Sequence, residues 1–92
     1  FLQLAHEIAL HHHERWDGTG YPHQLAGTEI PLSARIVALA DVYDALSARR
    51  VYKAAIPHQE CVETIRREAG KQFDPQVVDA FLLIADDFQN IR

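Results

Sequence analysis

A cluster of helix-breaking residues in the first half of the chain most limits how it can fold. Three glycines and two prolines fall within residues 15–31, at Gly18, Gly20, Pro22, Gly27 and Pro31. Glycine and proline interrupt helices and favour turns, so this stretch is predicted to be a loop. Loops of this length inside compact domains are typically functional or disordered. Apolar side chains are spaced through the segment as anchors, and we therefore expect an ordered, functional loop.

Helical patterns flank this loop on both sides. Apolar residues recur at helical spacing in residues 1–14 and 32–49, and a third pattern covers residues 57–69. Asp74 and Pro75 form an N-cap and first-turn pair, which predicts a fourth helix from residue 75. No segment alternates like a strand. The predicted fold class is all-α, a helical bundle of about four helices with one long loop between the first two.

Composition narrows the class of protein and its compartment. The net charge of −4 argues against a surface for nucleic acid polymers. No apolar run approaches the ~20 residues that span a bilayer, so we expect no membrane span. Cys61 is the one cysteine, which fits a reducing cytoplasm, and its helical context predicts a buried, unreactive thiol. Because residues 1–4 are already apolar and helix-like, we expect the chain to be a piece of a longer protein.

Histidines gather at the end of the first predicted helix, in the run His11-His12-His13-Glu14. Imidazole is a ligand for iron, zinc, manganese or nickel. Successive helical residues point about 100° apart, so neighbouring histidines can each supply one ligand to two adjacent ions. The structural alternative is a solvated, histidine-rich helix end.

Two carboxylates interrupt the apolar pattern of the second predicted helix. Asp41 and Asp44 stand three residues apart, so they share one helix face. Burial of an ionised carboxylate is unfavourable unless it is paired or bound to a metal, and this pattern favours a metal site. The alternative is a structural ion pair with Arg35 or Arg49.

A basic cluster follows that helix, in Arg49-Arg50-Val51-Tyr52-Lys53. Arginine binds phosphate through a bidentate fork, and lysine binds it as a point charge. The same cations would also favour the negative end of the helix dipole, which is the structural alternative.

Taken together, these motifs resemble the HD-GYP family in order and spacing, from about residue 11 to residue 81. The most specific part is the string HHE-x-WDG-x-GYP at residues 12–22. Shorter matches follow at Ile30-Pro31-Leu32, Ala34-Arg35-Ile36, Asp41, Asp44-Ala45-Leu46, Tyr52-Lys53 and Phe73-Asp74-Pro75.

The resemblance implies a partial helical HD-superfamily fold and a metal-dependent enzyme. The family's activity is hydrolysis of cyclic di-GMP to pGpG, and in some members to GMP, in bacterial signal transduction. Its centre holds two or three divalent ions, with iron or manganese as the metals. By motif position, the residues that correspond to metal ligands are His12, His13 and Asp41.

The same resemblance implies roles for residues around the metal centre. Tyr21 corresponds to a substrate-facing loop residue, and Arg50 and Lys53 correspond to a phosphate-binding pair. The residues expected to support or shape the site are Asp44, Gly20 and Pro22.

Two departures from the family pattern limit what this chain can do alone. The His-Asp pair and another upstream histidine ligand are not among its residues, so residues 1–92 are predicted to be the C-terminal part of a single HD-GYP domain. Three candidate ligands are too few to hold a bridged metal pair, so we expect the isolated chain to be inactive and to retain few ions or none. Gln24 stands where the family has glycine, and it strains the loop if that position requires a positive φ.

Two other functions stay open at this point. In one, the domain is catalytically inactive and docks a partner, such as a diguanylate cyclase domain, through the GYP loop. In the other, the enzyme acts on a different cyclic dinucleotide. Apolar surface left by absent helices also favours a homodimer.

Overall fold

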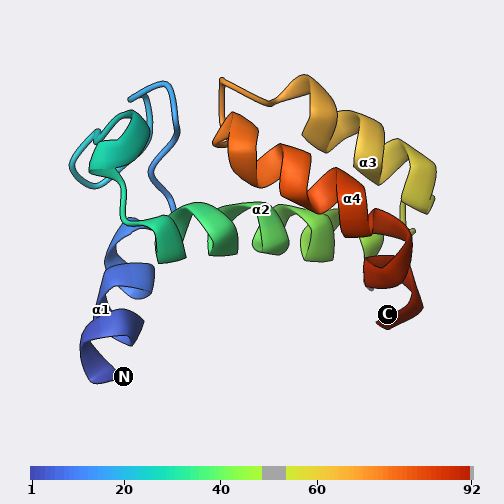
Figure 1. Ribbon diagram of the computed structural model, residues 1–92, viewed down its shortest axis with the longest axis horizontal. Coiled ribbons are helices and arrows are strands. Elements are labelled where there is room, and N and C mark those ends of the chain that lie inside the picture. Colours follow the sequence, from blue (N-terminus) through green and yellow to red (C-terminus); the bar gives the residue numbers. More distant parts are fainter. Residues whose placement is uncertain (49–53, 92) are drawn as a thin grey trace.

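The computed structural model describes residues 1–48 and 54–91, and within these residues it contains four helices and no strand. Three helices lie along one another, and α1 departs from the bundle near the start of α2 (Figure 1). The predicted all-α fold class is therefore confirmed. The elements in chain order are α1 (Leu2–His11), the short 3-10 turn η1 (Gly27–Glu29), α2 (Leu32–Ser47), α3 (His58–Arg67) and α4 (Pro75–Ile91).

The hydrophobic core lies between α2, α3 and α4. Tyr43 of α2 and Ile65 of α3 are fully buried, and Phe73 reaches the core from the turn between α3 and α4. Burial of each such side chain contributes about 1.5–3 kcal/mol relative to its exposed state. Cys61 is fully buried in the same cluster, which confirms the predicted buried thiol.

Proline and aspartate mark the starts of the later helices, as the sequence predicts. Pro31 and Pro57 are the N-cap residues of α2 and α3. The Oδ1 of Asp74 accepts the main-chain N–H of Gln76 at 2.8 Å, so Asp74 caps α4. The bounds of α2 and α3 agree with the predicted ranges within two residues.

The end of α1 differs from the prediction. The helix was expected to continue to about Glu14, but it ends at His11 with His12 as its C-cap residue. The main-chain N–H of Glu14 bonds to the carbonyl of His11 at 3.0 Å, which closes a turn and redirects the chain. His13 and Glu14 therefore do not follow the 100° helical spacing.

The loop after α1 is ordered by main-chain hydrogen bonds to distant segments. The N–H of Trp16 bonds to the carbonyl of Gln72 at 3.1 Å, and the N–H of Asp17 bonds to the carbonyl of Lys71 at 2.9 Å. The N–H of Gly27 returns to the carbonyl of Trp16 at 2.9 Å. The prediction that this loop is ordered is confirmed, and the turn before α4 is one of its anchors.

A buried ion pair joins the starts of α2 and α4. The Nη1 of Arg35 lies 2.7 Å from the Oδ2 of Asp74, and both side chains are largely buried. The Nε of Arg35 also donates to the carbonyl of Ile30 at 2.9 Å. Arg35 is thus committed to Asp74, and the alternative in which it neutralises Asp41 or Asp44 is wrong. Arg49, the other candidate, lies outside the described residues.

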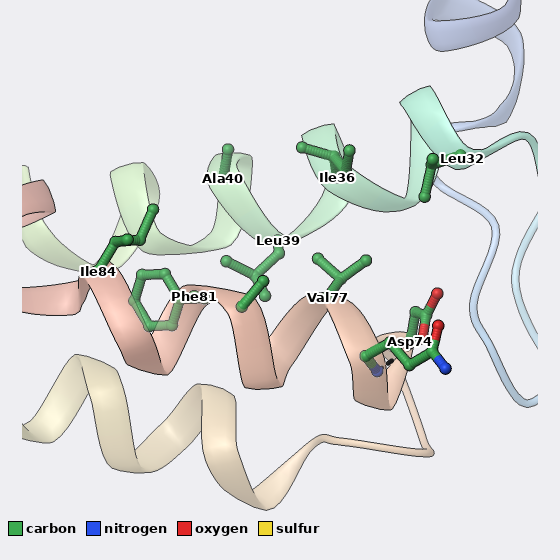
Figure 2. A pocket seen from close by; sticks show the side chains of 10 residues that line it. Leu32, Ile36, Leu39, Ala40, Asp74, Val77, Phe81 and Ile84 are labelled. Atoms are coloured by element: carbon green, nitrogen blue, oxygen red, sulfur yellow. Dashed lines mark hydrogen bonds between the residues drawn. The ribbon is translucent and has the colours of Figure 1, made fainter.

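Among the described residues, two apolar surfaces stay open to solvent. One is a groove between α2 and α4 with a volume of about 360 Å³, and Figure 2 shows Ile36, Val77 and Ile84 along it. The other is α1, which contributes no buried residue. Among the described helices, none has both the length and the apolar character needed to cross a membrane.

Candidate metal centre and its loop

A pocket of about 370 Å³ opens where α1, the following loop and α2 meet. It brings together the three predicted metal ligands His12, His13 and Asp41, although the long loop separates the histidines from the aspartate in sequence. Its other lining residues are Glu14, Arg15, Thr19, Gly20, Tyr21, Ala38, Val42, Ala45 and Gln72.

His12 is held in one tautomer by the end of α1. Its Nδ1 lies 2.8 Å from the carbonyl oxygen of Ile8, and because a carbonyl can only accept, Nδ1 carries the proton. In the neutral ring Nε2 then keeps its lone pair. This Nε2 lies 3.9 Å from the Oδ2 of Asp41, so a lone pair faces a carboxylate oxygen. A cation between the two atoms would satisfy both groups, and a backbone carbonyl on the other ring nitrogen is the usual support for a metal-binding histidine.

Asp41 differs from the sequence argument in one respect. Its side chain is 60% exposed, so it is not a buried carboxylate that requires compensation. The interpretation based on burial is wrong, because the face of α2 that carries Asp41 opens onto the pocket. The position of Asp41 opposite His12 now carries the case for a metal ligand.

His13 lies past the end of α1 and makes contacts with two rings. Its ring centroid is 3.9 Å from that of His12 and 4.9 Å from that of Tyr21, with the Tyr21 ring nearly parallel at 18°. Tyr21 is exposed at 60%. The structure therefore places the predicted substrate-facing tyrosine directly beside a predicted metal ligand.

Glu14 is the residue that the sequence reasoning missed. It is only 3% exposed, and its two oxygens accept the main-chain N–H groups of His23 at 2.9 Å and Leu25 at 3.0 Å. Burial alone would raise the pKa of Glu14, but these two N–H groups and the neighbouring His11 ring hold that pKa below its ordinary value. The sequence offered one signal for this role, because Glu14 is an acidic residue between a histidine run and a loop rich in glycine and proline.

Gly20 fits the backbone of the loop, whereas Gln24 is strained in it. A Cβ on Gly20 would lie 2.5 Å from the carbonyl oxygen of His13 and 2.5 Å from the main-chain nitrogen of Arg15, so no other residue fits there. Gln24 adopts φ 54°, the left-handed conformation that its glycine counterpart would adopt without cost. The strain expected at Gln24 is therefore found.

A second carboxylate stiffens the first part of the loop. Asp17 accepts hydrogen bonds from the hydroxyl of Thr19 at 2.6 Å and from its main-chain N–H at 3.0 Å. These bonds, together with the Arg15 guanidinium, lower the pKa of Asp17. These hydrogen bonds fix the turn from Asp17 to Thr19, which leads to Gly20.

One other predicted site residue lies outside the pocket, and two cannot be assigned a place. Asp44 is exposed and is not among the residues that line the pocket. Arg50 and Lys53 lie outside the described residues, so their predicted phosphate contacts stay predictions.

The residues present fit a divalent cation. Two imidazoles and a carboxylate are suitable ligands for iron, manganese or zinc, and His12 is already supported in the tautomer that coordination needs. A pair of bridged ions requires more ligands than these three side chains supply.

Comparison with known proteins places this site in a family. A family model described as an HD domain matches residues 1–77. A protein of Vibrio cholerae named cyclic di-GMP phosphodiesterase is 58% identical over 88 residues, which cover 96% of this chain and 18% of that protein. A protein of the same name from Thermotoga maritima is 49% identical over 90 residues, covering 98% of this chain and 24% of that protein.

Structural comparison agrees with the sequence comparison. The crystal structure of a cyclic GMP-AMP-specific phosphodiesterase of Vibrio cholerae matches with a TM-score of 0.70 and 28% identity, over 91% of this chain and 21% of that one. The chain thus spans about a fifth of the length of the relatives it matches. It belongs to the HD domain family, and the resemblance to the HD-GYP phosphodiesterases that its motifs predict is confirmed.

Proposed function

We propose that the protein carrying this chain is a metal-dependent phosphodiesterase that hydrolyses cyclic di-GMP to pGpG and GMP. Residues 1–92 would form the C-terminal part of its catalytic domain. The observation that carries the proposal is the pocket in which His12 Nε2 faces Asp41 at 3.9 Å with His13 beside it. Relatives named for this activity are more than half identical to the chain over almost all of its length.

His12, His13 and Asp41 are the proposed ligands of this centre, with iron or manganese as the metal. Divalent ions bound there would supply a water of lowered pKa and would neutralise charge on the phosphoryl oxygens. The protein's part is to hold the ligands in place. The Ile8 carbonyl orients His12, and Tyr21 stacks on His13.

Tyr21 is also the proposed contact for the substrate. It is exposed at the rim of the pocket, and the hydrogen bonds from residues 23 and 25 to Glu14 fix the loop that carries it. Arg50 and Lys53, just beyond α2, are proposed to bind a phosphate of the substrate through charge-assisted contacts. We propose a cytoplasmic location, in keeping with the single buried thiol.

The substrate is tested by offering the full-length protein cyclic di-GMP and cyclic GMP-AMP separately and separating the products by chromatography. We expect cleavage of cyclic di-GMP to pGpG. Selective cleavage of cyclic GMP-AMP would instead assign the substrate class of the structural neighbour. Failure of the metal-loaded protein to cleave either one would contradict the proposal.

The phosphate-binding role is tested with Arg50→Ala. A charge-assisted contact is worth about 1.5–3 kcal/mol, so affinity for cyclic di-GMP should fall roughly ten- to a hundredfold. Metal content should not change, because arginine cannot ligate a cation. Arg67→Ala, on the exposed face of α3, is the matched control. If Arg50→Ala instead removes the metal or unfolds the domain, Arg50 has a structural role.

A second candidate function is docking of a signalling partner, such as a diguanylate cyclase domain, through the GYP loop. The exposure of Tyr21, Pro22 and His23 favours it, since ordered exposed loops are frequent contact surfaces. Docking without catalysis would survive loss of the metal, whereas hydrolysis would not.

A further inference from the structure

We propose that His11, Glu14 and His23 form a separate cation site that fastens the loop to the end of α1. It would take a divalent ion that prefers imidazole with one carboxylate, such as Zn²⁺. This site goes beyond the proposed function. It borders the pocket of His12, His13 and Asp41, because Glu14 also lines that pocket, but its two imidazoles do not line it.

The three ligand atoms lie close enough together to share one ion. One ligand atom from each residue lies within 4.8 Å of the other two. The Nδ1 of His11 is 3.4 Å from the Oε2 of Glu14, and the Nδ1 of His23 is 4.0 Å from the same oxygen. Bonds of about 2.0–2.1 Å at tetrahedral angles place neighbouring ligands roughly 3.3–3.5 Å apart. The His11–Glu14 pair already has this spacing, and the His23 ring would have to move closer to Glu14 to reach it.

Hydrogen bonding alone does not account for the arrangement. The Oε2 of Glu14 already accepts the main-chain N–H of His23 at 2.9 Å, which leaves it one lone pair. Two imidazole nitrogens lie within 4.0 Å of the same oxygen. The His11 contact of 3.4 Å is longer than the 2.7–2.9 Å typical of a charge-assisted hydrogen bond, and the His23 contact of 4.0 Å is too long for any. A cation placed among the three atoms uses all of their lone pairs.

The chemistry of the three groups matches a zinc-like ion. Glu14 offers a carboxylate oxygen, and His11 and His23 offer imidazole nitrogens, which such ions prefer. Two histidines and one glutamate are a known zinc ligand set that leaves a fourth position open. The His11 side chain is 15% exposed and that of His23 is 57% exposed, so solvent can reach this fourth position.

The position of the site gives it a consequence for the loop. His23 lies two residues after Tyr21, and Glu14 also holds Leu25 through its other oxygen. An ion bound there would add a link between α1 and the segment that carries Tyr21. An ion at this site would therefore order the loop without using His12, His13 or Asp41 as ligands.

Zinc stoichiometry tests the proposal. The full-length protein is stripped with a chelator and dialysed against buffered free Zn²⁺, and bound zinc per chain is measured by mass spectrometry. The double variant His11→Gln/His23→Gln should bind one zinc fewer than the wild type. His6→Gln, an exposed histidine elsewhere on α1, should bind as much as the wild type. The single variant His23→Gln should lose about tenfold or more in affinity at this site.

A second double variant separates this site from the proposed catalytic centre. His12→Ala/His13→Ala should still bind the zinc that the His11/His23 variant loses. Equal zinc in the wild type and the His11/His23 variant would overturn the proposal, as would loss of the same single ion in both double variants. The zinc count does not depend on hydrolysis, so failure of the phosphodiesterase assay leaves it interpretable. Circular dichroism of each variant checks that the helices are retained.

Discussion

The carboxylate of Glu14 receives main-chain N–H groups from His23 and Leu25, and it thereby joins the end of α1 to the far side of the loop. Tyr21 lies inside the segment closed by these bonds and stacks on His13. At the scale of single residues, the position of the predicted substrate contact thus depends on one buried acid outside the predicted ligand set.

Replacing Glu14 with glutamine should lower the free energy of unfolding by about 1–3 kcal/mol, because one main-chain N–H would face an amide NH₂ in a buried site. Urea denaturation followed by circular dichroism measures the change. Glu63→Gln is the matched control, since Glu63 is exposed on α3 and forms an ion pair with the exposed Arg66, and it should change stability by less than about 1 kcal/mol. Equal effects of the two substitutions would show that Glu14 does not anchor the loop.

Substitution of Gln24, in contrast, should raise the stability of the protein. A residue other than glycine in the left-handed region costs about 1–2 kcal/mol, so Gln24→Gly should raise the melting temperature. The gain is reduced by the greater flexibility of glycine in the unfolded chain. Gln76→Gly, within α4, should lower the melting temperature, because glycine in a helix costs roughly 0.5–1 kcal/mol. A decrease for both variants would mean that Gln24 is not strained.

At the scale of elements, much of the fold could be predicted and the loop contacts could not. The start of α4 was correct because Asp74 and Pro75 are residues with strong positional preferences. The docking of Trp16 and Asp17 on residues 71–72 uses main-chain groups, which every residue carries, so no pattern marks it.

The same limit applies to the candidate site. The meeting of His12 and Asp41 follows from a motif and from helix packing, and both could be anticipated. The exposure of Asp41 and the early end of α1 could not, because each depends on how the loop turns back after His11. The pairing of Arg35 with Asp74 likewise joins residues that are far apart in sequence.

The ion pair between Arg35 and Asp74 should contribute strongly to stability. Arg35→Ala should destabilise the protein by about 3–5 kcal/mol, because it leaves the carboxylate of Asp74 buried without its partner. Thermal unfolding measures the loss. Arg66→Ala removes an exposed pair on α3 and should cost less than about 1 kcal/mol. If Arg35→Ala were as mild as Arg66→Ala, the pair would not hold α2 and α4 together.

At the scale of the whole molecule, the candidate metal centre lies apart from the hydrophobic core. The core lies between α2, α3 and α4, whereas the candidate metal centre lies where α1 and the loop meet α2 (Figure 1). The groove between α2 and α4 and the apolar side chains of Phe1, Leu2 and Leu4 remain exposed. A homodimer through these surfaces, and inactivity of residues 1–92 in isolation, stay predictions.

The function proposed for this molecule depends most on whether His12, His13 and Asp41 hold the catalytic metal. Metal content and cyclic di-GMP hydrolysis should therefore be measured on the same preparations of the full-length wild type and of His13→Ala. We predict that the wild type contains iron or manganese and produces pGpG, and that His13→Ala loses both the metal and the turnover while keeping its helical content. A His13→Ala protein that retains the full metal complement and hydrolyses cyclic di-GMP at the wild-type rate would contradict the assignment.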